Sequence, residues 1–155
     1  MSVASKGATL SSKAMAVTRI MIGVLFIMFA QYKLFNRDFA HGGYEKYVSG
    51  WTQESSVGLY KPFLRATLRY PVASGYAVGV AEMLIGISMV IGYAVRFFSV
   101  VGALFMLNLT LATWMLPAGT AAWRYLGNQL DNIPLLLLFV IFYVHRAGST
   151  WGLDR

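Results

Sequence analysis

Four apolar runs constrain the fold of this chain more than any other feature of the sequence. A helix that crosses a bilayer needs about 20 mostly apolar residues. Runs near this length cover residues 14–35, 72–94, 97–116 and 130–146, and the fourth is the shortest. Only 12% of the 155 residues are charged, about half of what an average soluble domain carries. The sequence therefore predicts an integral membrane protein with little chain left for a second domain.

The pattern within these runs favours helices. Backbone polar groups inside a bilayer are satisfied only in helices or closed barrels, and the alternating ten-residue segments of a membrane barrel are absent. We therefore expect an all-α fold, a four-helix membrane bundle that forms one domain over residues 1–155. The linker 36–71 is the main segment outside the spans.

The first 13 residues are rich in Ser, Ala and Gly and resemble the start of a signal peptide. The apolar run that follows is too long for a signal core, contains Arg19 near its beginning, and has Met28 at minus three from a cleavage site after Ala30, where a small residue is needed. We therefore expect a retained first helix.

Basic residues divide almost equally between the two membrane faces, but Arg96 is the only charge in the short second connection. This favours both termini in the cytoplasm.

Two helical patterns lie in the linker 36–71. One combines basic residues at every fourth position with an adjacent apolar stripe, which is typical of a helix lying in the membrane interface. Its basic residues are Lys61, Arg65 and Arg69, and its stripe is Tyr60, Leu64 and Leu68. The other pattern is the aromatic series Tyr44, Tyr47 and Trp51. Two interpretations stay open for this series: a headgroup-level aromatic belt, or rings that roof the bundle and stack on a quinone or another flat ligand.

Glu82 is an ionisable residue deep in the second run. It lies about 15 Å from the start of the run, near the middle of a hydrocarbon core about 30 Å thick. A carboxylate there must be protonated, paired or facing a polar cavity. Gly75, Gly79 and Gly86 share its helix face, so a neighbouring helix can approach closely and Glu82 should point into the bundle. The candidate roles are a proton relay, an acceptor for a ligand hydroxyl, or a buried interhelical hydrogen bond.

The other polar residues are placed by their position along the apolar runs. Asn108 in the third run lies nearly level with Glu82, so the two residues can share a site. Gln31 and Lys33 end the first run and should cluster at the rim with the polar residues that open the fourth run. Those residues are Asn128, Gln129, Asp131 and Asn132.

Two interpretations of the rim stay open. In one, Asp131 pairs with Lys33. In the other, Asn128, Asp131 and Asn132 cap the fourth helix while Lys33 snorkels to the headgroups. Arg19 and Arg96 are expected to snorkel at the opposite edge of the membrane.

Several classes of site are excluded or disfavoured. The chain has no cysteine, which excludes disulfides, thiolate metal sites and iron–sulfur clusters. The two histidines, His41 and His145, are predicted on opposite membrane faces, so they cannot clamp a haem; we expect no metal. The net charge of +7 is assigned to loops that meet anionic lipid, and no nucleic-acid partner is expected.

The chain resembles the DoxX/DoxD family from about Thr18 to its C-terminus. One group of residues carries the resemblance in each run: Arg19, Gly23, Phe26 and Lys33-Leu34; Glu82, Gly86, Gly92 and Arg96; Asn108-Leu109; and Ala147-Gly148 with Trp151-Gly152-Leu153-Asp154. The resemblance implies a small four-helix protein of the cytoplasmic membrane of a bacterium or archaeon. It also implies the role of the large membrane subunit of thiosulfate:quinone oxidoreductase, which joins two thiosulfates to tetrathionate while reducing a quinone. Ser149-Thr150 stands where the family pattern has a basic residue, which removes a charge that could hold an anion.

Two functional hypotheses follow. In the first, a quinone binds between the second and third helices, Glu82 handles its proton and Asn108 contacts a carbonyl, with Lys33, Gln31 and Trp51 completing the binding site. A chain without cysteine, or a recognisable flavin, haem or metal site, would need a membrane or periplasmic partner subunit for this redox reaction. In the second, the chain is a non-catalytic accessory or scaffolding subunit of a larger respiratory or photosynthetic complex. Transport is a weaker third option, because no inverted repeat is visible.

Overall fold

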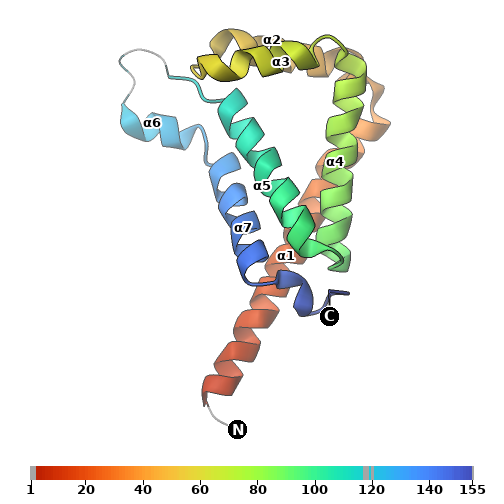
Figure 1. The fold of residues 1–155 in the computed structure, drawn as a ribbon, viewed down its shortest axis with the longest axis vertical. Helices are drawn as coiled ribbons and strands as arrows, with labels where there is room; N and C mark the ends of the chain where they lie inside the picture. Colours follow the sequence, from red (N-terminus) through yellow and green to blue (C-terminus); the bar gives the residue numbers. More distant parts are fainter. Residues whose placement is uncertain (1–2, 117–118, 120, 155) are drawn as a thin grey trace.

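A computed structural model describes residues 3–116, 119 and 121–154, and every regular element within these ranges is helical. The four long helices are α1 (Val3–Phe35), α4 (Pro71–Ile91), α5 (Val95–Ala112) and α7 (Asn132–Val144) (Figure 1). Three of them are long and apolar enough to cross a membrane, namely α4, α5 and the Leu10–Phe35 part of α1. The chain is therefore a helical membrane protein with at least these three candidate spans.

The fourth expected span is the shortest helix of this set. The 13 residues of α7 give a length of about 20 Å, well below the 30 Å of a hydrocarbon core. The helix begins two residues later than expected and ends at Val144, because Arg146 adopts a left-handed backbone conformation with φ of 48°. The expected count of four membrane helices is therefore not confirmed, because only three helices in the described part of the chain have spanning length.

The linker between α1 and α4 folds into a roof, which we define as η1 (Phe39–Gly43), α2 (Tyr44–Glu54), η2 (Gly58–Tyr60) and α3 (Lys61–Thr67). The roof lies across one end of the long helices (Figure 1). Gly42, with φ of 148°, supplies the backbone conformation that turns the chain from α1 into the roof. Tyr44, Val48 and Leu64 are buried on the inner side of the roof.

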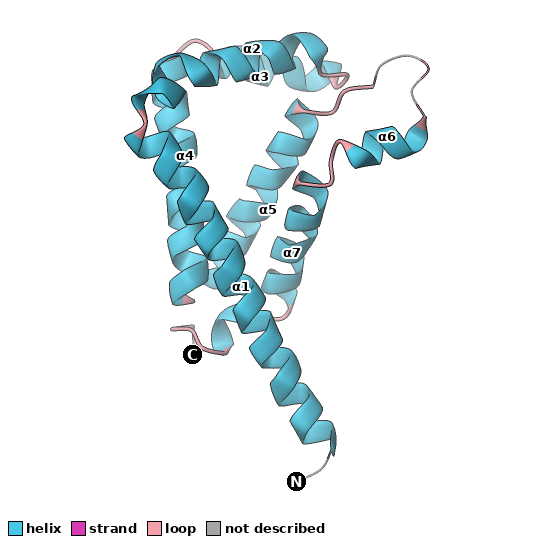
Figure 2. Cartoon of the chain, turned by 180° about the vertical axis from the view of Figure 1, so that it is seen from behind, coloured by secondary structure: helices cyan, strands magenta, loops and turns pink. Residues whose placement is uncertain are grey.

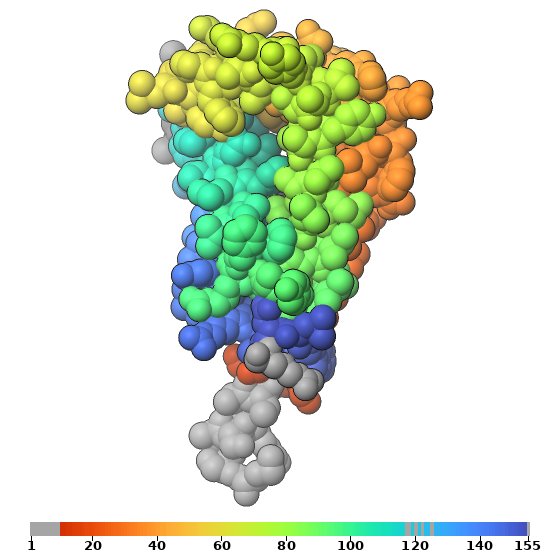
Figure 3. Space-filling model, turned by 45° about the vertical axis from the view of Figure 1, so that its right-hand side comes forward, coloured from red at the N-terminus to blue at the C-terminus, as the bar shows by residue number. Residues whose placement is uncertain are grey.

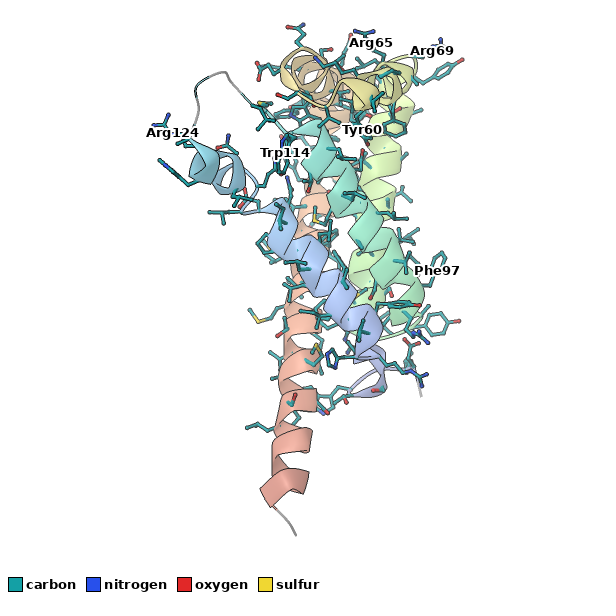
Figure 4. The ribbon with its side chains drawn as sticks, turned by 60° about the vertical axis from the view of Figure 1, so that its left-hand side comes forward. Tyr60, Arg65, Arg69, Phe97, Trp114 and Arg124 are labelled. Atoms are coloured by element: carbon teal, nitrogen blue, oxygen red, sulfur yellow. The ribbon has the colours of Figure 1, made fainter. Side chains whose placement is uncertain are left out.

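The predicted basic helix is present as α3, which ends at Thr67, two residues before Arg69. It packs against α2 across the end of the long helices, and Arg65 and Arg69 point outward, away from the spans (Figure 4). Leu64 and its apolar neighbours fix this position, because they pack against residues of α2 and α5. The expected location of this helix flat on the bilayer stays a prediction.

The long helices form two pairs, α1 with α4 and α5 with α7. The pairs meet near the α4–α5 turn and diverge toward the roof, as Figures 1 and 2 show from opposite sides. The helix α6 (Ala122–Gly127) projects from the roof end of the α5–α7 pair. The main hydrophobic core fills the region where the pairs meet and contains Ile22, Phe26, Ile85, Met89, Met106, Phe139 and Phe142. The end of the bundle beneath the roof lies outside this main core.

The C-terminal segment covers the α4–α5 turn (Figure 3). Both carboxylate oxygens of Asp154 accept backbone hydrogen bonds at the start of α5, from Ala94 N at 2.6 Å and Val95 N at 2.7 Å. The carbonyl of Gly92 accepts two more, from Leu153 N and Asp154 N, each at 2.9 Å. The C-terminal segment therefore binds the α4–α5 turn at the end of the bundle opposite the roof, and the first turns of α1 project beyond it (Figure 1).

The expectation that Arg19 snorkels to the headgroups is wrong. Its side chain is 0% exposed, and Nη2 donates a hydrogen bond to the carbonyl of Trp151 at 3.0 Å. Arg19 is buried because the C-terminal segment, which follows the last helix, folds back over it. Arg96 remains exposed.

Candidate functional site

A cavity of about 530 Å³ lies between α1, α4 and α5 beneath the roof, a volume in the usual range of small-molecule sites. Most of its walls are apolar or aromatic. Phe105 closes it toward the core, because the Phe105 ring packs edge-on against Phe26 with ring centroids 6.3 Å apart. Its lining includes the polar side chains of Lys33 and Asn108 and the aromatic side chains of Phe39, Tyr44 and Trp51.

Glycines bring α1 and α4 into backbone contact along one wall of the cavity. A Cβ atom at Gly79 would lie 2.9 Å from Leu34 Cδ2, and one at Gly86 would lie 2.8 Å from the carbonyl oxygen of Gly23. Such distances are too short for any side chain larger than hydrogen. The expected small-residue stripe is confirmed, and the neighbour that it admits is α1.

Close approach of α1 and α4 places Lys33 against Glu82. The ammonium Nζ of Lys33 forms an ion pair with Oε1 of Glu82 and lies 5.4 Å from the centroid of the Phe39 ring. Glu82 is only 5% exposed, so the expected inward orientation is confirmed. Its second oxygen, Oε2, is buried and has no hydrogen-bond partner in the described part of the chain. Lys33 lines the cavity and Glu82 lies directly behind it.

Lys33 therefore does not lie at the membrane rim, and the expected Asp131–Lys33 pair is not formed. The reason is that α1 ends well below the first residue of α4. Ala40, already in the roof, is the neighbour of Gly75, so the last turn of α1 lies level with the middle of α4. Glu82 is about 16 Å along α4 from Pro71, and Lys33 is at the same depth.

The polar residues that precede α7 form their own network around Thr113. Gln129 is 1% exposed and donates from Nε2 to the carbonyl oxygen of Thr113 at 3.1 Å. Asn132 Nδ2 donates to Gln129 Oε1 at 3.1 Å. Asp131 occupies the N-cap position of α7 but makes no side-chain capping hydrogen bond, so the capping interpretation is also wrong for this residue. The network fixes the α5–α7 junction instead.

Asn108 lines the cavity from α5, opposite Lys33. Its Oδ1 accepts a hydrogen bond from the hydroxyl of Tyr60, which points from the roof toward α5 (Figure 4). Among the described residues nothing accepts a hydrogen bond from Asn108 Nδ2, so this amide group can donate into the cavity. Burial, with a smaller contribution from Tyr44, raises the pKa of Tyr60 to about 12. Tyr60 is therefore a neutral donor at physiological pH.

The remaining candidate residues divide between the cavity and the outside. Trp51 lines the cavity. Gln31 does not; it is exposed on the outer side of α1. Phe39 and Tyr60 belong to the site but were missed as site residues, because their places depend on how the roof folds. Ser55 helps to hold the roof there, since its Oγ donates to the carbonyl oxygen of Leu111 at 3.1 Å.

The arrangement suits a flat, amphipathic molecule that carries hydrogen-bond acceptors. The Lys33 ammonium and the Asn108 amide donate from opposite walls, and aromatic rings supply stacking surfaces between them. No group of three or more His, Cys, Asp or Glu side chains that could hold a metal ion occurs among the residues that the structure describes.

Comparison with known proteins gives one match. The DoxX family model matches residues 14–116, a range that contains every element that lines the cavity. No curated protein and no solved structure matches the chain. The matched range ends before α7 and the C-terminal segment.

Proposed function

The chain belongs to the DoxX family of membrane proteins, and we propose that it is the quinone-binding membrane subunit of an oxidoreductase that works with a redox partner. One observation carries the proposal: a cavity of about 530 Å³ with aromatic walls has a half-buried ammonium on one side and an amide donor on the other. A quinone ring has two carbonyl acceptors and two flat faces, so its chemistry matches this cavity.

The chain's own residues have separate roles in this proposal. Lys33 donates a hydrogen bond from its ammonium to one carbonyl, and Asn108 donates from Nδ2 to the other. Glu82 Oε1 pairs with Lys33 and fixes its position, while the unpartnered Oε2 is the atom that can take up a proton and pass it toward the quinone. A bound quinone would supply the chemistry of taking up two electrons and two protons. The electrons come from a partner subunit that carries the redox centre.

The position of the cavity suggests where that partner binds. The cavity lies under the roof, and both termini lie at the opposite end of the molecule. With the termini in the cytoplasm of a bacterial or archaeal cell, as Arg96 in the short α4–α5 connection favours, the roof faces the periplasm. A periplasmic partner, or a membrane partner with a periplasmic domain, would then bind at the roof, directly above the cavity.

The decisive experiment measures quinone binding to the purified protein. A short-tailed quinone should quench the fluorescence of Trp51, which lines the cavity. Asn108→Leu and Lys33→Gln should each weaken binding by about tenfold, the effect of removing one hydrogen bond. Gln31→Leu is the matched control, because Gln31 lies on α1 outside the cavity and its loss should leave affinity unchanged. Equal affinity in the wild type and Asn108→Leu would reject the cavity as the quinone site.

An accessory role in a larger complex is the second hypothesis, and Glu82→Gln separates the two. We expect this variant to assemble with its partners while quinone turnover falls. Full turnover with normal assembly would remove Glu82 from the mechanism and favour the accessory role. The glycine stripe gives that role no support, because its members face other parts of the same chain: Gly79 and Gly86 face α1, and Gly75 faces the roof.

A further inference from the structure

A groove separate from the cavity lies on the outer surface between α5 and α7 and has a volume of about 230 Å³. It extends from Ser99 and Tyr143 at one end to Leu107 and Leu136 at the other, about 12 Å along α5. Its lining shares no residue with the cavity. Several of its walls are open to the surroundings, with Leu104 60% and Val140 45% exposed. In a membrane this groove faces lipid.

The groove is apolar along its length, and a basic side chain lies beside its end near the α4–α5 turn. The guanidinium of Arg96 stacks over the ring of Tyr143, with Cζ 4.7 Å from the ring centroid. Tyr143 lines the groove, so the exposed Arg96 side chain lies next to the groove without lining it. A cation therefore adjoins one end of an apolar groove.

Arg96 has no carboxylate partner in the described part of the chain. Asp154, which binds the start of the same helix, uses both oxygens to accept hydrogen bonds from Ala94 N and Val95 N. The guanidinium has one face covered by Tyr143 and its N–H edges free, which is the arrangement that suits a phosphate. Arg96 is the second residue of α5, so its charge lies at the headgroup level of the membrane.

We propose that the α5–α7 groove is a binding site for one anionic phospholipid. The phosphate contacts Arg96, and the first part of an acyl chain occupies the apolar groove from Val100 to Leu107. A charged group followed by an apolar surface is the order found along a phospholipid. The anionic headgroup supplies the countercharge that Arg96 lacks within the described residues. This site is independent of the proposed quinone site.

Native mass spectrometry of the full chain, released from mixed micelles with equal amounts of phosphatidylglycerol and phosphatidylcholine, tests this proposal. The wild type should retain one phosphatidylglycerol in about fivefold preference over phosphatidylcholine, as one basic residue near a membrane surface provides. Arg96→Gln should abolish the preference. Arg69→Gln removes the same charge at the opposite end of the molecule and should leave the preference intact.

A second variant tests the apolar part of the site. Val100 is 44% exposed and lines the groove, so Val100→Phe fills the groove without adding bulk to the core. It should lower phosphatidylglycerol retention at least fivefold. Unchanged retention in Val100→Phe, or an unchanged preference in Arg96→Gln, would overturn the proposal. A detergent-stable dimer that dissociates in Val100→Phe would also overturn it, because the groove would then hold a second copy of the chain.

Discussion

The ammonium of Lys33 contacts Oε1 of Glu82 in the middle of the α1–α4 interface, and Oε2 of the same carboxylate is buried without a hydrogen-bond partner among the described residues. Two charges in an apolar region compensate each other only when both are present. The pair therefore acts as a unit, in stability as well as in any proton chemistry.

Lys33→Met should destabilise the protein strongly. Removal of one partner from a buried ion pair leaves an uncompensated charge, and the usual cost is about 3–5 kcal/mol. The double variant Lys33→Met/Glu82→Gln should be more stable than Lys33→Met, because it removes the stranded carboxylate. Unfolding in detergent, followed by circular dichroism, measures both. If the double variant were no more stable than the single one, the charge would not be the cause of the loss.

The sequence predicted Glu82 correctly as an inward-facing residue but not its partner. Depth in an apolar run and a stripe of glycines are local features, and they place Glu82 inside a helix interface. The partner depends on how far α1 extends beside α4. The chain leaves α1 early, at a turn that contains Gly42, and this turn puts Lys33 at mid-depth. Spacing in the sequence gives no measure of that offset, so Asp131 was considered as the partner.

Gly86→Ala should destabilise the α1–α4 interface. Its new Cβ would lie 2.7 Å from Ile27 Cγ1 and 2.8 Å from the backbone oxygen of Gly23, so α1 would have to shift. Overpacking of this kind costs about 1–3 kcal/mol. Gly50→Ala is the matched control, because Gly50 lies in α2 with nothing within 4 Å of a new Cβ, and it should be neutral or stabilising by up to about 1 kcal/mol. Thermal unfolding of the two variants in one detergent compares them, and equal losses would contradict the close α1–α4 contact.

Asp154→Asn should weaken the attachment of the C-terminal segment. An asparagine side chain offers one acceptor in place of the two that contact Ala94 N and Val95 N, and it lacks the charge that favours a helix N-terminus. We expect a loss of about 1–2 kcal/mol. Asp131→Asn is the control, because Asp131 makes no capping hydrogen bond on α7 and should change stability little. The unfolding midpoint in detergent separates the two variants. An Asp154→Asn protein as stable as the wild type would assign no capping role to this residue.

The C-terminal segment shows what a family resemblance adds and what it leaves out. The resemblance identified Trp151 to Asp154 as a group of residues typical of the family. No periodicity in so short a segment indicates where the segment packs. The carbonyl of Trp151 binds Arg19, 132 positions earlier in the chain. A contact over that separation depends on the completed bundle, which is why Arg19 was expected to be exposed at the membrane edge.

Tyr60→Phe should change how stability depends on pH at alkaline values. Burial and Tyr44 raise the pKa of Tyr60 to about 12 in the folded protein, above the ordinary value of 10 in the unfolded chain. The folded state therefore favours the neutral phenol, which donates to Asn108, and this contribution is fully present below pH 10 and is lost as the pH rises toward 12. Unfolding midpoints measured between pH 8 and 11.5 should fall less steeply in Tyr60→Phe than in the wild type. Tyr70→Phe alters a side chain that is 74% exposed and should keep the wild-type slope. Identical slopes in Tyr60→Phe and the wild type would mean that folding does not raise the pKa of Tyr60.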